Sequence, residues 1–447
     1  MPKRAPSQRW SSFEGWDYNG MRERLKALVA KLDKSTLLRH AELVTGQKVR
    51  MSEPFSAGQY WICFEIIAED GSLVIARVRL PRHPVTPPNI SEKDEEYAIM
   101  CEIATMRLVR QRLPRLALPL VYAYEGPGSQ LAIDAGAAYM LIEGFYGNTL
   151  QDVVPNLFNL SLLEQEHVMA QWTMIQSSIA TLTYPLIGSI SAIAESGEPV
   201  IGKLSSAAAE GLAVQRPFQN TADYFTALGE AALHRAHTDN SIQGRSRSCE
   251  RGVRLFLDIV QSTPLFQTHD ARYPLNHMDL GTQNIIVDDD LNFLAVIDWE
   301  FAQTAPWQVN HYPMPFPLLW SDERINNILN NNEHLAYKNV SRQATARQLY
   351  CKKFDEATAK LASQDLFLDN SFPDVLESAA SRIYACFSKL GIMPEQDEDF
   401  VNEMARLAYG FDAERTKRYL ENLSYKENDA LPEHCLPVSD SVLYSDI

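Results

Sequence analysis

The segment from His277 to Glu300 holds residues whose types and spacing suit catalysis. It reads HMDLGTQNIIVDDDLNFLAVIDWE. Its apolar stretches predict two short strands, 285–287 and 293–297, joined by a polar turn. Pairing of these strands would bring Asn284, which precedes the first strand, close to Asp298, which ends the second.

An amide oxygen beside a carboxylate forms a pair of hard ligands. Such ligands suit Mg²⁺, which keeps several waters and shares phosphate oxygens instead of needing a protein cage. Asp279, in the loop before the first strand, is placed to accept a proton from an attacking hydroxyl. A base, two metal ligands and a rigid scaffold are the parts of phosphoryl transfer. We include His277 with Asp279 in the candidate catalytic set, and we expect its ring to be buried and to brace the loop by hydrogen bonds.

These residues resemble the aminoglycoside phosphotransferase and choline kinase family. The resemblance rests on H-x-D-x-x-x-x-N at 277–284, followed by I-D-W-E at 297–300. The neighbouring segments 301–307 and 311–317 are similar to a large fungal set of phosphotransferase-family proteins. The resemblance implies an α+β, bilobal protein-kinase-like fold, with a β-rich N-lobe and a mainly helical C-lobe. It also implies ATP and Mg²⁺ as cofactors and a small molecule with a hydroxyl group as acceptor.

The upstream half offers the cation that a kinase fold needs on an N-lobe strand. Val74-Ile-Ala-Arg77 stands where V-A-I-K would stand, and arginine supplies a fixed charge with a bidentate fork. Glu102 lies on a mainly apolar stripe of the predicted helix 92–112, so it needs a partner, and Arg77 is the natural one. Arg79 points the same way by strand alternation and stays an alternative.

Two weaker features complete the predicted nucleotide site. The segment 53–60 has one glycine, Gly58, which would let backbone amides approach phosphate, although a simple turn explains it equally well. The segment 143–147 breaks the strand pattern and is predicted to be a hinge. The adenine would be met by backbone N–H and C=O groups of the segment 140–145, with Glu143 and Phe145 among the binding residues.

Two competing motifs are set aside. Gly197 to Lys203 matches most of a P-loop, but Leu204 replaces the Ser or Thr that would meet Mg²⁺, and the flanking patterns favour a hairpin. A protein kinase would show H-R-D, D-F-G and A-P-E, whereas here Met278 stands in place of the Arg of H-R-D and Trp299 in place of the Phe of D-F-G. A small-molecule kinase is therefore favoured.

Composition limits the partners. The 447 residues include 41 Lys and Arg against 57 Asp and Glu, a net charge of −16, which argues against a nucleic-acid binder. The six cysteines form no CxxC motif, and no apolar run approaches the roughly 20 residues of a membrane span. We expect a cytoplasmic protein without membrane or nucleic-acid partners; the basic first residues leave a mitochondrial location as the alternative.

The remaining patterns set the expected elements and domains. Residues 20–45 and 320–425 are predicted to be mostly helical. Strand pairs are expected at 60–67 with 73–80 and at 186–194 with 199–204, and single strands at 118–124 and 138–142. Ser91 and Ser161 are predicted helix caps. The predicted domains are a leader and helix (1–48), an N-lobe (49–146), a C-lobe (147–425) and an acidic tail (426–447).

The functional prediction is an ATP-dependent phosphotransferase that moves the γ-phosphate to a hydroxyl of a small molecule. Asp279 would be the base, and Asn284 with Asp298 would hold Mg²⁺. The alternative is a catalytically weak kinase-fold binding or regulatory protein, suggested by the single-glycine loop and by Arg77 in place of lysine. The sequence does not identify the acceptor or the oligomeric state.

Overall fold

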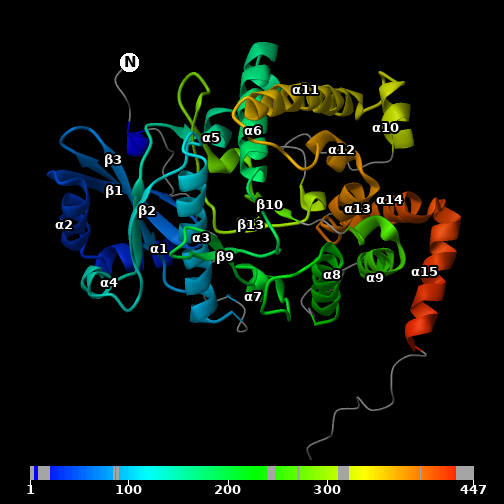
Figure 1. Cartoon of the computed structure of the whole chain (residues 1–447), viewed down its shortest axis with the longest axis horizontal. Coiled ribbons are helices and arrows are strands. Elements are labelled where there is room, and N and C mark those ends of the chain that lie inside the picture. Colours follow the sequence, from blue (N-terminus) through cyan, green and yellow to red (C-terminus); the bar gives the residue numbers. More distant parts are fainter. Residues whose placement is uncertain are drawn as a thin grey trace, which may run out of the picture.

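A computed structural model describes residues 5–8, 21–83, 86, 90–238, 247–268, 272–310, 322–392 and 394–428. These residues form a sheet-rich N-terminal part and a largely helical C-terminal part that lie side by side (Figure 1). The predicted bilobal α+β architecture is thereby confirmed, whereas the domain boundaries stay a prediction. Most of the basic leader, most of the acidic tail and the segment 311–317 lie outside the described residues.

The N-terminal part is built on an antiparallel sheet with strand order β1-β2-β3-β5-β4. The strands are β1 (Val49–Ala57), β2 (Trp61–Ala68), β3 (Leu73–Arg79), β4 (Val121–Glu125) and β5 (Tyr139–Glu143). Branched and aromatic residues favour these strands, and Gly71 provides the positive φ of 83° that the turn between β2 and β3 requires. Strand β1 reaches Ala57, so the segment expected to be a phosphate loop is mostly strand and turns only at 58–60.

Helices cover both faces of this sheet. The helices α1 (Met21–Lys31) and α2 (Lys34–Thr45) pack on one face, and Asp33 between them is the N-cap of α2. Helix α3 (Glu92–Arg112) packs on the other face and has the predicted Ser91 cap, completed by Asp94 into a capping box. The short α4 (Gln130–Ala135) was not predicted.

The C-terminal part contains the other helices and, among the described residues, five short strand pairings. Its helices are α5 (Leu150–Val153), α6 (Leu162–Ala180), α7 (Ala207–Glu210), α8 (Thr221–Thr238), α9 (Arg247–Ser262), α10 (Asp322–Leu329), α11 (Tyr337–Ala362), α12 (Phe372–Glu377), α13 (Ala379–Phe387), α14 (Asp397–Tyr409) and α15 (Ala413–Asn428). Its strands are β6 (Asn148–Thr149), β7 (Thr183–Tyr184), β8 (Ile190–Ile193), β9 (Pro199–Ile201), β10 (Tyr273–Asn276), β11 (Ile285–Val287), β12 (Phe293–Val296) and β13 (Gln303–Thr304). In the described part of the chain, no helix is both long and apolar enough to cross a membrane.

Two strand pairs in the C-terminal part matter for the site. The predicted β8–β9 hairpin is present, so the P-loop lookalike at 197–203 is a hairpin, and it packs against α3. Strands β11 and β12 pair antiparallel behind the loop 277–284. An antiparallel five-stranded sheet, a helix behind it and a helical second part make up the protein-kinase-like fold that the sequence predicts.

Candidate active site

The loop 277–284 is anchored by His277 at its start. The ring is 1% exposed, its Nε2 lies 3.1 Å from the Ile297 carbonyl oxygen, and it meets Trp299 edge-on at 4.7 Å. Burial lowers the pKa of His277 to about 4, so the ring is neutral at physiological pH. The structure therefore gives His277 the expected bracing position beneath the loop.

The loop turns sharply after His277. Met278 has a φ of 65°, a conformation that costs a non-glycine residue about 1–3 kcal/mol and persists only where the surroundings hold it. Here the Met278 amide donates to Asn276 Oδ1 at 2.8 Å. Asp298 shares this conformation, with a φ of 66°. Two strained residues at one site are typical of functional sites.

Asp279 and Asn284 are joined directly. Asn284 Nδ2 donates to Asp279 Oδ2 at 2.9 Å and to the Asp279 carbonyl at 2.8 Å, while Gln283 Nε2 donates to Asp279 Oδ1 at 3.0 Å. Because the Asn284 nitrogen is used in this way, its Oδ1 oxygen is left as the ligand atom. That oxygen accepts no hydrogen bond from the described residues.

The β11–β12 pair brings Asn284 and Asp298 to one end of the hairpin. Ile285 is the partner of Val296, and the Ile297 amide donates to the Asn284 carbonyl at 2.9 Å. The two candidate ligands therefore flank the same hydrogen-bonded pair of strands. The Asp298 side chain is 37% exposed, so solvent reaches the carboxylate.

The N-lobe contributes Arg77. Its Nη1 lies 2.5 Å from Glu102 Oε1, and its Nη2 lies 4.0 Å from Asp298 Oδ1. The predicted pair between Arg77 and Glu102 is therefore present, and Arg77 also faces the C-terminal part. Arg79, the alternative, pairs with Glu95 at 3.2 Å.

A cavity of about 240 Å³ lies between these groups. Its lining includes candidate site residues from the sequence analysis and their direct neighbours: Gly58, Arg77, Glu143, Gly144, Phe145, Ile297 and Asp298. Its other walls are largely aromatic and aliphatic, including Phe55, Trp61, Ile75 and Ile142. The cavity thus combines apolar walls with a cation and a carboxylate at one end.

Glu143, in the predicted hinge, is the last residue of β5. Its side chain accepts from Arg110 Nη1 at 3.0 Å and from the Leu120 amide at 3.1 Å, so it ties α3 and the residue before β4 to the end of β5. The Gly144 amide donates to the Leu73 carbonyl. Among the described residues, the Phe145 amide donates to no backbone carbonyl.

Electrostatics at Asp298 favour a cation. Burial and the nearby carboxylates of Glu102 and Asp279 raise the pKa of Asp298 to about 6, against the opposing effect of Arg77. Burial, followed by Asp298 and Glu102, raises the pKa of Glu300 to about 8. One arginine therefore faces several acidic groups, and a bound cation would relieve their repulsion.

The donor set fits Mg²⁺ and not a metal held by protein alone. No group of three or more His, Cys, Asp or Glu side chains in the described part of the chain could hold a metal ion. Mg²⁺ does not require one, because it commonly uses one or two carboxylates together with phosphate and water oxygens. Asp298 and the Asn284 Oδ1 oxygen match that requirement.

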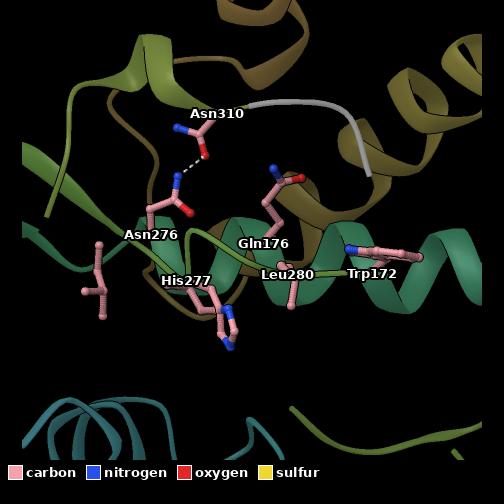
Figure 2. Close-up of a pocket in the computed structure, with 8 residues that line it drawn as sticks. Trp172, Gln176, Asn276, His277, Leu280 and Asn310 are labelled. Carbon is pink, nitrogen blue, oxygen red and sulfur yellow. Dashed lines mark hydrogen bonds between the residues drawn. The ribbon is translucent and has the colours of Figure 1, made fainter. Parts of the chain in front are cut away.

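A second, small cavity of about 20 Å³ lies behind the loop (Figure 2). Asn276 and Asn310 point toward one another there, with Nδ2 of Asn276 donating to Oδ1 of Asn310 at 3.0 Å. Gln176 of α6 lies on the opposite side and accepts from the Tyr350 hydroxyl at 2.6 Å. This volume suits one water molecule and is too small for a substrate.

Comparisons with known proteins give structural matches only. No family model matches the chain, and no curated protein matches it. Solved structures of small-molecule kinases match over most of its length. The macrolide 2'-phosphotransferase MphH from Brachybacterium faecium is 11% identical, covers 87% of this chain and 97% of its own, and has a TM-score of 0.39. The choline kinase LicA from Streptococcus pneumoniae is 11% identical, with 87% and 100% covered and a TM-score of 0.36.

A third match is the amicoumacin kinase hAmiN in complex with AMP-PNP, Ca²⁺ and Ami. It is 13% identical, covers 91% of this chain and 96% of its own, and has a TM-score of 0.32. These identities and scores are too low to assign an activity to this chain.

Sequence reasoning missed several supporting residues. Asn276 directly precedes the motif 277–284, and Gln283 lies within it. This closeness to the motif was the only signal in the sequence that they hold the loop. Tyr60 and Trp61 stack on Arg79 at 4.7 and 5.2 Å, and Trp61 also lies 4.9 Å from Arg77. Aromatic residues at the start of a strand gave no hint of this, because stacking depends on strand register.

Proposed function

We propose that this chain is an ATP-dependent phosphotransferase that phosphorylates a hydroxyl of a small molecule. One observation carries the proposal. Asp279, Asn284 and Asp298 gather at one end of the β11–β12 hairpin, and Arg77, held by Glu102, faces them from the other lobe. Such an arrangement of base, ligands and fixed cation is what phosphoryl transfer requires.

Asp279 is the proposed base. Its carboxylate is oriented by Gln283 and Asn284, each donating to a different oxygen, so its position is fixed before an acceptor arrives. Proton acceptance from a hydroxyl at such a carboxylate contributes typically about 10²–10⁴-fold to a rate. His277 is a positioning residue here, because its buried ring touches the Ile297 carbonyl and Trp299.

Asp298 and the Asn284 amide oxygen would hold Mg²⁺. When bound, ATP with this ion supplies the phosphoryl group and neutralises its charge. Arg77 would face the phosphates, and the turn at Gly58, which lines the same cavity, would cover them. Backbone groups of Glu143 and Phe145 would meet the base of the nucleotide at the apolar end of the cavity.

The acceptor is proposed to be a small molecule in the cytoplasm. The alternative, a kinase-fold binding or regulatory protein that no longer transfers phosphate, remains the competing function. The two differ in turnover and not in nucleotide binding, so both quantities have to be measured.

The test combines thermal shift and slow ATP hydrolysis. We expect ATP with Mg²⁺ to raise the melting temperature of the wild-type chain, and neither alone to do so fully. Asp298→Ala should abolish the Mg²⁺-dependent shift, because a ligand is lost. Asp279→Asn should keep the shift and slow hydrolysis by roughly 10²–10⁴-fold. Asp290→Ala, an exposed acid in the nearby β11–β12 turn, is the matched control and should change neither.

Two results would decide against the proposal. A wild-type chain without any shift at millimolar nucleotide and Mg²⁺ removes the nucleotide site. A normal shift with hydrolysis that Asp279→Asn leaves unchanged removes the catalytic assignment and favours the binding protein.

A further inference from the structure

A third cavity, larger than the two described above, lies where α11 crosses α6 (Figure 1). Its volume is about 1030 Å³, and we call it the α6–α11 cleft. Its walls come from the segment 112–117, from one face of each helix and from β12. It shares no lining residue with the nucleotide cavity, so the site proposed above does not account for it.

The cleft has regular walls. The α6 wall has helical spacing and consists of His167, Gln171, Met174 and Ser178. The α11 wall includes Lys353, Ala357 and Lys360 at the same spacing, and Gln364, just beyond the end of the helix, continues it. Phe293 and Ala295, alternate residues of β12, lie on one face of that strand and close the floor.

Hydrogen bonds fix the floor to its neighbours. Gln171 Nε2 donates to the Leu291 carbonyl at 3.0 Å, and its Oε1 accepts from the Phe293 amide at 2.8 Å. The Val296 amide donates to the Ala117 carbonyl at 2.9 Å, which ties the segment 112–117 to β12. The cleft is therefore preformed by elements that are bonded to one another.

The cleft is basic in an acidic protein. Its lining holds Arg112, Arg115, Lys353 and Lys360 against the single carboxylate Glu356, although the whole chain has a net charge of −16. Arg112 pairs with Glu198 and Lys353 pairs with Glu356, at 2.7 and 3.0 Å.

Two of the four cations have no carboxylate partner among the residues that the structure describes. Arg115 Nη1 donates at 3.0 Å to Gln364, a neutral amide. Lys360 makes no ion pair with any residue that the structure describes. Both side chains are exposed at the cleft, so their charge is free for an anionic ligand.

The floor between these cations is apolar. Leu361 and Leu113 are 3% and 6% exposed, and Met174, Phe293 and Leu366 are partly exposed beside them. A ligand that carried charge alone would leave this surface in contact with water. A ligand with an apolar body would cover it and gain free energy from the buried area.

We propose that the α6–α11 cleft binds a small amphipathic anion. Its apolar body would lie on Met174, Phe293 and Leu366, and its carboxylate or phosphate group would be held by Arg115 and Lys360. The proposal does not depend on phosphoryl transfer, because none of these residues belongs to the nucleotide site.

The probes are four molecules with the same ten-carbon chain: decanoate, decyl phosphate, decanol and decyltrimethylammonium. Binding to the full chain is measured by isothermal titration calorimetry below the concentration at which each probe forms micelles. We expect decanoate or decyl phosphate to bind at least about tenfold more tightly than the neutral and cationic probes. The order of the two anions shows whether the natural head group is a carboxylate or a phosphate.

Variants place the binding in the cleft. The double variant Arg115→Glu/Lys360→Glu should weaken anion binding by about tenfold or more. Lys352→Glu reverses a single charge on the same helix as Lys360, at an exposed residue outside the cleft, and should weaken it by less than about twofold. Met174→Trp should block binding of every probe by filling the floor.

Several results would overturn the proposal. One is the absence of anion binding at millimolar concentration. Others are equal binding of decanol or of the cationic probe, and an equal loss in Lys352→Glu. Circular dichroism and unchanged melting of each variant show that the loss does not come from unfolding.

Discussion

Replacing Arg77 tests how the two lobes are joined at the site. Glu102 is 1% exposed and the Arg77 side chain is 12% exposed, so Arg77→Met leaves a carboxylate buried beside the sheet without its partner. Breaking a buried ion pair from one side typically costs about 3–5 kcal/mol. This is a large share of the total stability of a domain, about 5–15 kcal/mol.

The reverse change should cost less. Glu102→Gln keeps the volume and removes the buried charge, and Arg77 still has Asp298 Oδ1 4.0 Å away. We therefore expect the loss of unfolding free energy to be clearly larger for Arg77→Met than for Glu102→Gln. The double variant Arg77→Met/Glu102→Leu should recover most of the stability, because well-packed apolar residues often replace a buried pair without loss.

Denaturant unfolding measures stability, and the Mg²⁺-ATP thermal shift measures binding. The double variant should be stable and yet fail to bind nucleotide, since the cation is gone. Arg418→Met, which breaks an exposed pair with Glu414 on α15, is the control and should change stability by about 1 kcal/mol or less. Equal losses in Arg77→Met and Arg418→Met would falsify the buried-pair reasoning. Normal nucleotide binding by the double variant would remove Arg77 from the site.

Three further predictions concern protonation, packing and the position of α3. The pKa values of Asp298 and Glu300 are raised in the fold, to about 6 and about 8. The folded chain therefore holds more protons than the unfolded chain, and the stability of the ligand-free protein should fall as the pH rises from about 4 to 8. In denaturant titrations, Glu300→Gln should make this fall less steep. A Cβ at Gly147 would lie 2.4 Å from a backbone oxygen of β11, so Gly147→Ala should cost about 1–3 kcal/mol, whereas Gly128→Ala, with nothing within 4 Å, should stay within about 0.5 kcal/mol. Lys203 pairs with Asp94 near the start of α3. Lys203→Ala should therefore speed amide exchange in the first half of α3 and weaken nucleotide binding, and unchanged exchange there would show that this ion pair does not hold the helix.

Local chemistry explains what the sequence predicted well. The Ser91 and Ser161 caps, the strand pairs around residues 70 and 196 and the hairpin after Asn284 each depend on residues close in the chain. The pairing of Arg77 with Glu102 was also predictable, because a glutamate on an apolar helix stripe requires a nearby cation.

What the sequence did not predict depends on contacts between distant segments. The side chain of Glu143 accepts hydrogen bonds from Arg110 and from the Leu120 amide, and these contacts were not predicted. The α6–α11 cleft joins segments far apart in the chain, such as Arg115 and Gln364, which are 249 residues apart, and no local pattern marks such a cavity. The small α4 helix follows a turn with no long apolar period, so periodicity did not detect it.

The β8–β9 hairpin gives the P-loop lookalike a structural explanation. Lys203 Nζ binds Asp94 Oδ1 at 2.9 Å near the start of α3, and Arg112 at its end binds Glu198 Oε1 of the same hairpin at 2.7 Å. The Tyr97 hydroxyl donates to the Lys203 carbonyl at 2.9 Å, and a Cβ at Gly202 would lie 2.3 Å from that hydroxyl.

Both ends of α3 are thus tied to the C-terminal part, with Glu102 between them. A helix held in this way keeps its glutamate opposite Arg77 whether or not a ligand is present. The glycine and lysine that imitate a phosphate loop at 202 and 203 are instead explained by close packing on Tyr97 and by the ion pair with Asp94. The same geometry predicts that the cation of the proposed nucleotide site is in place before the nucleotide binds.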